Sequence, residues 1–420
     1  MNAFHNRKIL FAAICLVVAS NSIQVFLQYL PSPIMQILAE EFGVSFVLMG
    51  AIMSVCTVAS GFSPVLASLI TDCGSAVLAW CLGILCNIVG ALGAAAAARY
   101  EWMIVMYVLH GIGLGFSHCM IPVLVAKWIP RRYHATAMSV NLALHNLFVS
   151  VAYILPSRVL PVAGSWRNLM IGLAAAETLF ALVLFLISCR YQSPPLDLEG
   201  ERESASDSAA NSEKRTALFG ILWAAKNPTV RFLSLVMACF IWGNNTITTY
   251  FPTYLIQQGF DEVQAGAVTS IIPTMAILGA LTIGVFGSRN KRIIMKILPL
   301  FIAVGGIGMF LTSTKEFVRL FAGLFGFAYQ GWIPLAFSSF MALGSGDSRF
   351  TAGASALFNG LGHILTLLLP FATETLVSIF SVRKSLLLMQ LPLLIAALLT
   401  IFILNKPVRR SDNGSSVVCT

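Results

Sequence analysis

The sequence has very little charge. Only 10% of its 420 residues are Asp, Glu, Lys or Arg, whereas 58% are hydrophobic. A soluble domain carries about a quarter of its residues as charges, so this composition cannot form a water-exposed surface of ordinary size. Twelve membrane helices of about 20 residues each would use roughly 240 residues, which is close to the number of apolar side chains. The composition therefore predicts a multi-pass integral membrane protein.

Several motifs of other protein classes are missing. The nine cysteines form no C-x-x-C pair, which argues against a zinc site or a disulfide framework. The net charge of +9 comes from short basic clusters between apolar stretches, without the interleaved aromatics of a nucleic-acid site. Because the sequence has no nucleophile elbow, phosphate loop or clustered His/Glu ligands, we expect no enzyme activity, no cofactor and no metal.

Twelve apolar stretches are present, and they are predicted to be helices because open strand edges are not tolerated in lipid. The sequence places them at residues 9–31, 44–70, 77–98, 102–127, 135–162, 168–189, 231–256, 263–287, 293–314, 317–343, 351–378 and 385–404. The expected fold is therefore an all-α integral membrane protein with twelve transmembrane helices.

The basic residues predict the orientation. With the N-terminus in the cytoplasm, 19 of the 26 Lys and Arg residues fall on the cytoplasmic side, as the positive-inside rule requires. Both termini are then cytoplasmic, and we expect a bacterial-type inner (plasma) membrane. Arg7 and Lys8 precede an apolar run that continues to Leu30, which favours an uncleaved first helix over a signal peptide.

The two halves of the chain repeat. Gly50-x-x-x-Ser54 matches Gly266-x-x-x-Ser270 at an offset of 216 residues, and Tyr29-x-Pro31 matches Tyr250-x-Pro252. Two parallel six-helix pseudo-repeats with a site between them near the midplane are typical of secondary transporters. We expect one bundle at 1–190, a cytoplasmic linker at 191–230, a second bundle at 231–405 and a cytoplasmic tail at 406–420. Residues 217–225 of the linker are either a short amphipathic helix or simply more linker.

Two motifs support a family assignment: Lys127-Trp-Ile-Pro-Arg-Arg132 after the fourth span and Gly164-Ser-Trp-Arg167 before the sixth. With the six-plus-six layout, they make the chain resemble the major facilitator superfamily, nearer to bacterial cyanate-permease and oxalate/formate-type carriers than to sugar porters. Many proton antiporters of that family carry an Arg in the fourth span where this chain has Tyr107, which argues against a drug/proton antiporter.

The resemblance also implies a conformational gate at the cytoplasmic face. The family's loop between spans 2 and 3 joins an acid to basic residues, but here the first copy keeps only Asp72. The second copy keeps only the basic part, Arg289, Lys291 and Arg292. The resemblance implies that these residues latch the cytoplasmic face shut. The alternatives are a solvated loop acid for Asp72 and a purely topological role for the basic residues.

Polar side chains inside the spans are the candidate binding residues, because such groups are costly in hydrocarbon. The alternative role for each is an interhelical hydrogen bond. The resemblance implies that spans 1, 4, 7 and 10 line a central cavity flanked by spans 5 and 11. The predicted substrate-binding residues are Asn21, Gln24, His118, His145, Asn146, Trp242, Asn244, Asn245, Tyr329, Gln330, Asn359 and His363.

Three residues are candidates for proton coupling: His363, His145 and Glu374. Asn141 and His145 form an i, i+4 pair, in which the amide could fix the histidine tautomer. Glu177 could also carry a proton, but it lies in a peripheral span and its role is open.

These features predict a secondary active transporter that moves a small organic solute by rocker-switch alternating access. Because no Arg or Lys lies deep in the spans, the narrower hypothesis is proton-coupled transport of a monocarboxylate, with a protonated histidine facing the anion. Its partners would be the solute, the lipid bilayer and protons, with no nucleic acid, and the protein would act as a monomer. The alternatives are a multidrug or metabolite efflux carrier, favoured by the 29 phenylalanines, and more remotely a non-transporting membrane sensor.

Overall fold

The computed structural model describes residues 20–73, 76–128, 134–190, 225–286, 291–312, 314–343, 357–358 and 360–405. Nine helices in these ranges are long and apolar enough to cross a membrane. A tenth span is formed by Gly360–Thr366 and Leu369–Ile379, which are bent by 45° at a short break. The prediction of an all-helical membrane fold is confirmed. The tail at 406–420 lies outside the described residues, and so does the expected amphipathic segment at 217–225 except for its last residue.

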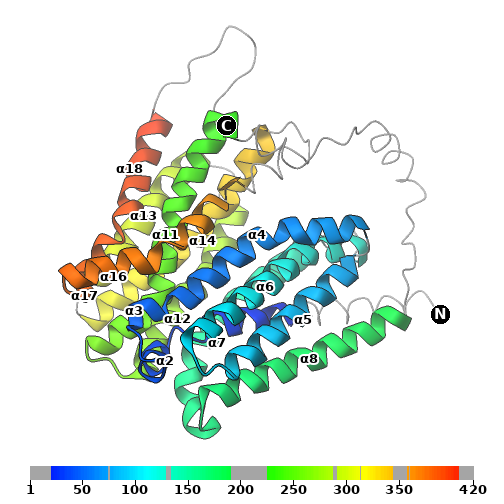
Figure 1. Cartoon of the computed structure of the whole chain (residues 1–420). Helices are drawn as coiled ribbons and strands as arrows, with labels where there is room; N and C mark the ends of the chain where they lie inside the picture. Colours follow the sequence, from blue (N-terminus) through cyan, green and yellow to red (C-terminus); the bar gives the residue numbers. More distant parts are fainter. Residues whose placement is uncertain are drawn as a thin grey trace, which may run out of the picture.

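The first half of the chain forms one group of helices, which begins with a helix over residues 20–29. It continues with α2 (Met35–Phe42), α3 (Phe46–Met49), α4 (Ala51–Cys73), α5 (Ala76–Ala95), α6 (Tyr100–Trp128), α7 (His134–Ala163) and α8 (Trp166–Arg190). α6 packs against α4 and α5, and α8 packs against α5 and α7 (Figure 1). The ends of these helices from α5 onward fall within a few residues of the predicted spans, whereas the predicted start of the first span at residue 9 lies outside the described residues.

The second half forms the other group. It consists of α11 (Pro228–Gln257), α12 (Glu262–Phe286), α13 (Lys291–Leu311), α14 (Lys315–Leu343), α16 (Leu369–Ile379), α17 (Val382–Leu388) and α18 (Leu391–Asn405). α14 packs against α12 and α13, while α18 packs against α11 and α13. Outward-facing apolar side chains of both groups, such as Leu186 on α8 and Phe402 on α18, are more than half exposed, as expected for surfaces that contact lipid.

Glycines allow the helices within each group to pack closely. A Cβ added at Gly111 on α6 would lie 2.3 Å from the carbonyl oxygen of Cys56 on α4. A Cβ at Gly326 on α14 would lie 2.0 Å from the carbonyl oxygen of Ile272 on α12. Small residues at such contacts are the usual means of helix association in membranes. The glycine-rich stretch of α6 is thus a packing surface.

A polar cluster joins three connections of the first group. The indole Nε1 of Trp166 donates to Glu41 Oε2 at 2.6 Å, and Arg167 forms an ion pair with the same carboxylate. Arg167 Nη2 also donates to the carbonyl oxygen of Ala97 at 2.9 Å. Gly164 has a φ of 72°, a conformation that glycine adopts without strain, and it turns the chain from α7 into α8. The Gly-Ser-Trp-Arg motif therefore ties α8 to α2 and to the α5–α6 connection.

This cluster predicts a pH dependence of stability. Burial alone would raise the pKa of Glu41, but the hydrogen bonds from Trp166 and Arg167 and the Arg167 charge outweigh it and lower the pKa below its ordinary value of 4.5. Because the folded-state pKa is depressed, the stabilisation is fully present above pH 4.5 and is lost as the pH falls through the lower folded-state value. Glu41→Gln should therefore lower Tm at pH 7. The carboxylate is about a third exposed, so we expect a loss of about 1 kcal/mol or less.

Thermal unfolding in detergent between pH 7 and pH 3 checks this expectation, with Glu40→Gln as the matched control because Glu40 is exposed on the same helix. The difference in Tm between wild type and Glu41→Gln should shrink toward acid pH. A difference that is constant across this range would show that the carboxylate charge is not what stabilises the cluster.

Candidate functional site

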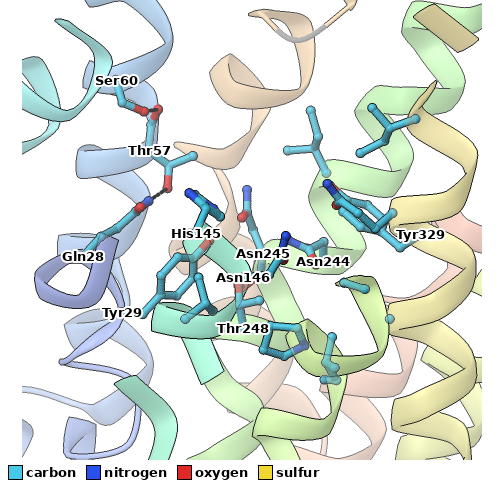
Figure 2. A pocket seen from close by; sticks show the side chains of 18 of the residues that line it. Gln28, Tyr29, Thr57, Ser60, His145, Asn146, Asn244, Asn245, Thr248 and Tyr329 are labelled. Atoms are coloured by element: carbon cyan, nitrogen blue, oxygen red, sulfur yellow. Dashed lines mark hydrogen bonds between the residues drawn. The ribbon is translucent and has the colours of Figure 1, made fainter. Parts of the chain in front are cut away.

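A cavity of about 280 Å³ lies between the two groups of helices (Figure 2). Its wall combines residues of the 20–29 helix, α4, α6 and α7 with residues of α11, α12, α14 and the Gly360–Thr366 segment. Fourteen of the 23 lining residues are polar: Gln28, Tyr29, Thr57, Ser60, His118, His145, Asn146, Tyr153, Asn244, Asn245, Thr248, Tyr329, Gln330 and His363. None of the lining residues in the described part of the chain is Asp, Glu, Lys or Arg.

Three histidines from three different helices meet at this cavity. The rings of His118 on α6 and His145 on α7 lie 5.7 Å apart between centroids, and His363 comes from the opposite group. Among the described residues, the nitrogens of His118 and His145 have no hydrogen-bond partner, so they can bind a ligand or a proton. Two imidazolium charges this close would repel each other, and the pair therefore accommodates one positive charge more readily than two.

Amides supply further polar groups of the wall. Asn245 Nδ2 donates to Thr366 Oγ1 at 2.8 Å, and Asn146 Nδ2 donates to the carbonyl oxygen of Leu142 at 2.9 Å. The side chains of Asn244 and Gln330 line the cavity and find no hydrogen-bond partner within the described ranges. An unsatisfied amide facing a cavity is available to a polar ligand, either as donor or as acceptor.

The structure brings eight of the twelve predicted binding residues to this wall: His118, His145, Asn146, Asn244, Asn245, Tyr329, Gln330 and His363. Asn21 and Gln24 do not line it, because both are fully buried within the first group. Trp242 is half-buried and packs against the hydrophobic core instead. Asn359 lies outside the described residues.

Sequence reasoning missed six polar residues of the wall: Gln28, Tyr29, Thr57, Ser60, Tyr153 and Thr248. Helical spacing could have indicated Gln28, which lies one turn after Gln24. Tyr153 and Thr248 meet across the two groups, since Tyr153 Oη donates to the Thr248 carbonyl oxygen at 3.1 Å, and no pattern in one helix signals such a contact.

The expected pairing of Asn141 with His145 is replaced by a contact with a different helix. Asn21 Nδ2 donates to Asn141 Oδ1 at 3.4 Å, so the asparagine amide joins the 20–29 helix to α7.

The two groups contact each other directly beyond the cavity. They converge near α3, α12 and α16 and spread apart toward the opposite end (Figure 1). Tyr250 Oη donates to the carbonyl oxygen of Val47 at 2.9 Å, and Ser45 Oγ donates to Glu374 Oε2 at 2.8 Å. Ser32 Oγ donates to the Thr248 carbonyl oxygen at 2.6 Å. We call this region the closed end; these contacts separate the cavity from the surface there.

Two glycines at equivalent positions of the repeat make the closed end possible. A Cβ added at Gly50 would lie 2.5 Å from Tyr250 Oη, and a Cβ added at Gly266 would lie 2.2 Å from the carbonyl oxygen of Tyr153. Gly50 precedes α4 and receives a tyrosine of α11, whereas Gly266 in α12 receives the backbone of α7. Each group thus offers a glycine to the other at the same place in its repeat.

The predicted gating and coupling residues are placed as follows. Glu374 is exposed at the closed end, bonded to Ser45, and does not line the cavity. Asp72 lies in the last turn of α4, but the description does not extend to its side chain. Arg289 lies outside the described residues, while Lys291 is half-buried and Arg292 is exposed at the start of α13. Their roles stay predictions.

Two helical groups that enclose a polar cavity and meet at one end define a membrane carrier. The family model of the Major Facilitator Superfamily matches residues 11–370. The chain therefore belongs to this superfamily of membrane transporters and is not an enzyme. The narrower likeness to cyanate-permease and oxalate/formate-type carriers stays a prediction.

Individual relatives are distant. The Probable metabolite transport protein CsbC of Bacillus subtilis (strain 168) is 24% identical over 332 residues, which cover 71% of this chain and 68% of the relative. A solved structure of a bacterial homologue of the human lysosomal transporter Spinster, in an inward-facing and occupied conformation, is 14% identical with a TM-score of 0.74, over 93% and 95% of the two chains. The D-xylose–proton symporter is 16% identical with a TM-score of 0.70, over 93% and 97%. The likeness to the two structures shows the fold.

The paired glycines predict a shift in the conformational equilibrium. Gly50→Ala and Gly266→Ala should each open the closed end, because the added methyl groups overlap Tyr250 and the Tyr153 carbonyl. Overpacking of this kind costs roughly 1–3 kcal/mol, which is enough to change the ratio of the two states about tenfold. Distances between spin labels at positions 40 and 378, in a variant without native cysteines, would report the change, since Glu40 and Ser378 are exposed on α2 and α16.

The matched control is Gly172→Ala on α8, where an added Cβ meets nothing within 4 Å. It should leave the distance distribution unchanged. If Gly50→Ala and Gly266→Ala leave it unchanged as well, these glycines do not determine closure.

Proposed function

We propose that this transporter moves a small polar organic solute across the membrane through the central cavity, and that the preferred solute is a monocarboxylate taken up with a proton. The observation that carries the proposal is the chemistry of the wall: three histidines and the two free amides of Asn244 and Gln330, with no fixed charge among the described lining residues. The relation to a metabolite transport protein supports the coarser part of the proposal.

Charge balance favours a single anionic group on the solute. A dianion in a dehydrated site would need fixed cations, and the described wall offers none. A histidine that takes up a proton supplies one positive charge, which matches one carboxylate, and the combination of solute and proton is electrically neutral. Neutrality of the loaded cavity lowers the cost of passing through an occluded state within the membrane.

The free amides give the rest of the solute its orientation. Asn244 and Gln330 can each donate and accept a hydrogen bond, and Tyr329 offers a hydroxyl from the same side of the cavity. The volume of about 280 Å³ lies at the lower limit of ligand pockets, which range over roughly 300–1,000 Å³, so a small metabolite fits better than a drug-sized one.

Efflux of apolar drugs is the weaker alternative. It was suggested by the abundance of phenylalanine in the sequence, but no phenylalanine belongs to the described cavity wall. Apolar drug sites are lined by hydrophobic and aromatic side chains, whereas the aromatic side chains of this described wall are tyrosines and histidines, each of which carries a polar group.

Transport would proceed by alternating access. In the described conformation the cavity is sealed at the closed end by contacts between the groups, including Tyr250 with Val47. On the predicted orientation, the closed end faces outward and the solute site is reached from the cytoplasm. Rocking of the two groups about the cavity would break these contacts and seal the opposite end.

Proteoliposome uptake tests the proposal. A panel of monocarboxylates, a pentose and a lipophilic cation should include a monocarboxylate whose accumulation depends on an inwardly directed proton gradient. His363→Ala should abolish this gradient-driven accumulation, because the protonatable group on the second bundle is gone. Glu262→Gln serves as the matched control, since Glu262 is exposed at the start of α12, far from the wall residues.

Accumulation of the lipophilic cation alone would contradict the proposal that the solute is a monocarboxylate. Carboxylate uptake that changes neither with the proton gradient nor with the His363→Ala substitution would contradict the proposal that a proton is cotransported.

A further inference from the structure

A fully buried carboxyl group lies inside the first helical group, away from the cavity wall. Glu177 on α8 is 0% exposed, as is Gln24 on the 20–29 helix. Gln24 Nε2 donates to Glu177 Oε1 at 2.7 Å. The other two atoms of the facing groups, Glu177 Oε2 and Gln24 Oε1, are buried and have no hydrogen-bond partner among the described residues.

No cation compensates this carboxyl group within the described part of the chain, where Glu177 takes part in no ion pair. The 20–29 helix and α5 contain no Asp, Glu, Lys, Arg or His in their described segments, while α7 carries His145 at the cavity wall and Arg158. The remaining titratable groups on these helices are His134, which is the first residue of α7, and the thiols and phenols of Cys81, Cys86, Tyr29 and Tyr153. A dehydrated carboxylate without a cation costs several kcal/mol.

His110 on α6 is the ionisable ring that contacts the backbone of Gln24. His110 Nε2 lies 3.2 Å from the backbone carbonyl oxygen of Gln24, a contact that a neutral ring with its proton on Nε2 satisfies. α6 also carries His118, which faces the cavity, and Glu101 in its first turn, which is exposed. None of these groups gives Glu177 a positive partner.

One proton bound to Glu177 accounts for the two oxygen atoms that have no hydrogen-bond donor. When Glu177 is protonated, its O–H becomes a donor that the unpartnered Gln24 Oε1 can accept, while the amide still donates to the carboxyl. When Glu177 is ionised, a carboxylate oxygen and the amide oxygen are both acceptors without a donor, and both stay unsatisfied in a dry site. We propose that the Glu177–Gln24 pair is a proton-binding site of this transporter, separate from the cavity histidines and occupied in the described conformation.

Gln28 connects this site to the cavity. It lies one helical turn after Gln24 and therefore on the same face of the 20–29 helix. It lines the cavity, and its Nε2 donates to Thr57 Oγ1 at 3.5 Å. A small movement of this helix would separate Gln24 from Glu177 and let cavity water remove the proton. The part of the inference in which the proton takes part in the transport cycle rests on the proposed function; the presence of the bound proton does not.

Infrared spectroscopy of the full-length transporter in a detergent without ester or acid groups tests the bound proton directly, because the ester carbonyls of lipids would absorb in the same region. At neutral pH exposed carboxyl groups are ionised, so a carboxylic-acid C=O band reports a buried, protonated group. We expect this band in wild type, its loss in Glu177→Gln, and its retention in Glu101→Gln, the matched control on the same helical group. A wild-type spectrum without the band, or a Glu177→Gln spectrum that keeps it, would overturn the proposal.

A second variant tests the proton site independently, in case Glu177→Gln does not fold. Gln24→Leu retains the carboxyl group but removes its hydrogen-bond partner, so the C=O band should shift to higher frequency. An unshifted band would show that Gln24 is not part of the proton site.

Transport measurements distinguish a failure of this inference from a failure of the proposed function. Glu177→Gln is permanently neutral, so it should lose proton-driven accumulation and retain solute exchange between the two sides, which needs no release of the proton. Accumulation at the wild-type level would show that Glu177 does not take part in the cycle. If wild-type uptake does not respond to the proton gradient, the coupling in the proposed function fails, while the infrared band still decides whether Glu177 holds a proton.

Discussion

A polar side chain inside a bilayer must find its hydrogen-bond partner within the protein, and the arrangement of this transporter follows from that constraint. Three solutions occur in the described structure. Gln24 donates a hydrogen bond to Glu177 inside a bundle, and Tyr250 and Ser32 bind carbonyl groups of the facing bundle. The third solution is the cavity, where histidines and amides face an enclosed space rather than lipid. Polar groups that remain available there are the ones that can bind a solute.

The contacts between the bundles are also hydrogen bonds formed within the protein, and they can break and form again. Tyr250 and Ser32 bind backbone carbonyls, and Ser150 Oγ contacts Thr274 Oγ1 at 3.0 Å, so none of these three contacts is an ion pair that has to be broken when the bundles separate. Hydrogen bonds of this type contribute about 0.5–1.5 kcal/mol each, and water can replace them. Gly50 and Gly266 permit the close approach on which these bonds depend. A closure built from weak contacts and good steric fit suits a carrier that has to populate two conformations.

The sequence predicts where the membrane-spanning helices lie, but it does not predict which buried side chains contact each other. Long apolar runs predict the spans within a few residues because the bilayer sets both their length and their backbone structure. Polar residues within those runs also predicted most of the cavity wall. Helical periodicity cannot tell whether a buried amide faces a cavity or a neighbouring helix, so Asn21 and Gln24 were assigned to the wall although both lie inside the bundle. The contact of Tyr153 with Thr248 joins helices 95 residues apart, and such pairings depend on tertiary packing alone.

Direct binding of a solute to the purified transporter tests the central claim, which is that the polar cavity is the solute site. Thermal unfolding is measured with the panel of monocarboxylates, pentose and lipophilic cation, in wild type and in Asn244→Leu, which removes a free amide and fills part of the cavity. A ligand at 100 times its Kd stabilises the folded state by about 2.7 kcal/mol. We predict that a monocarboxylate raises the Tm of wild type and that this rise is lost in Asn244→Leu. An equal rise in both proteins would show that the solute binds elsewhere.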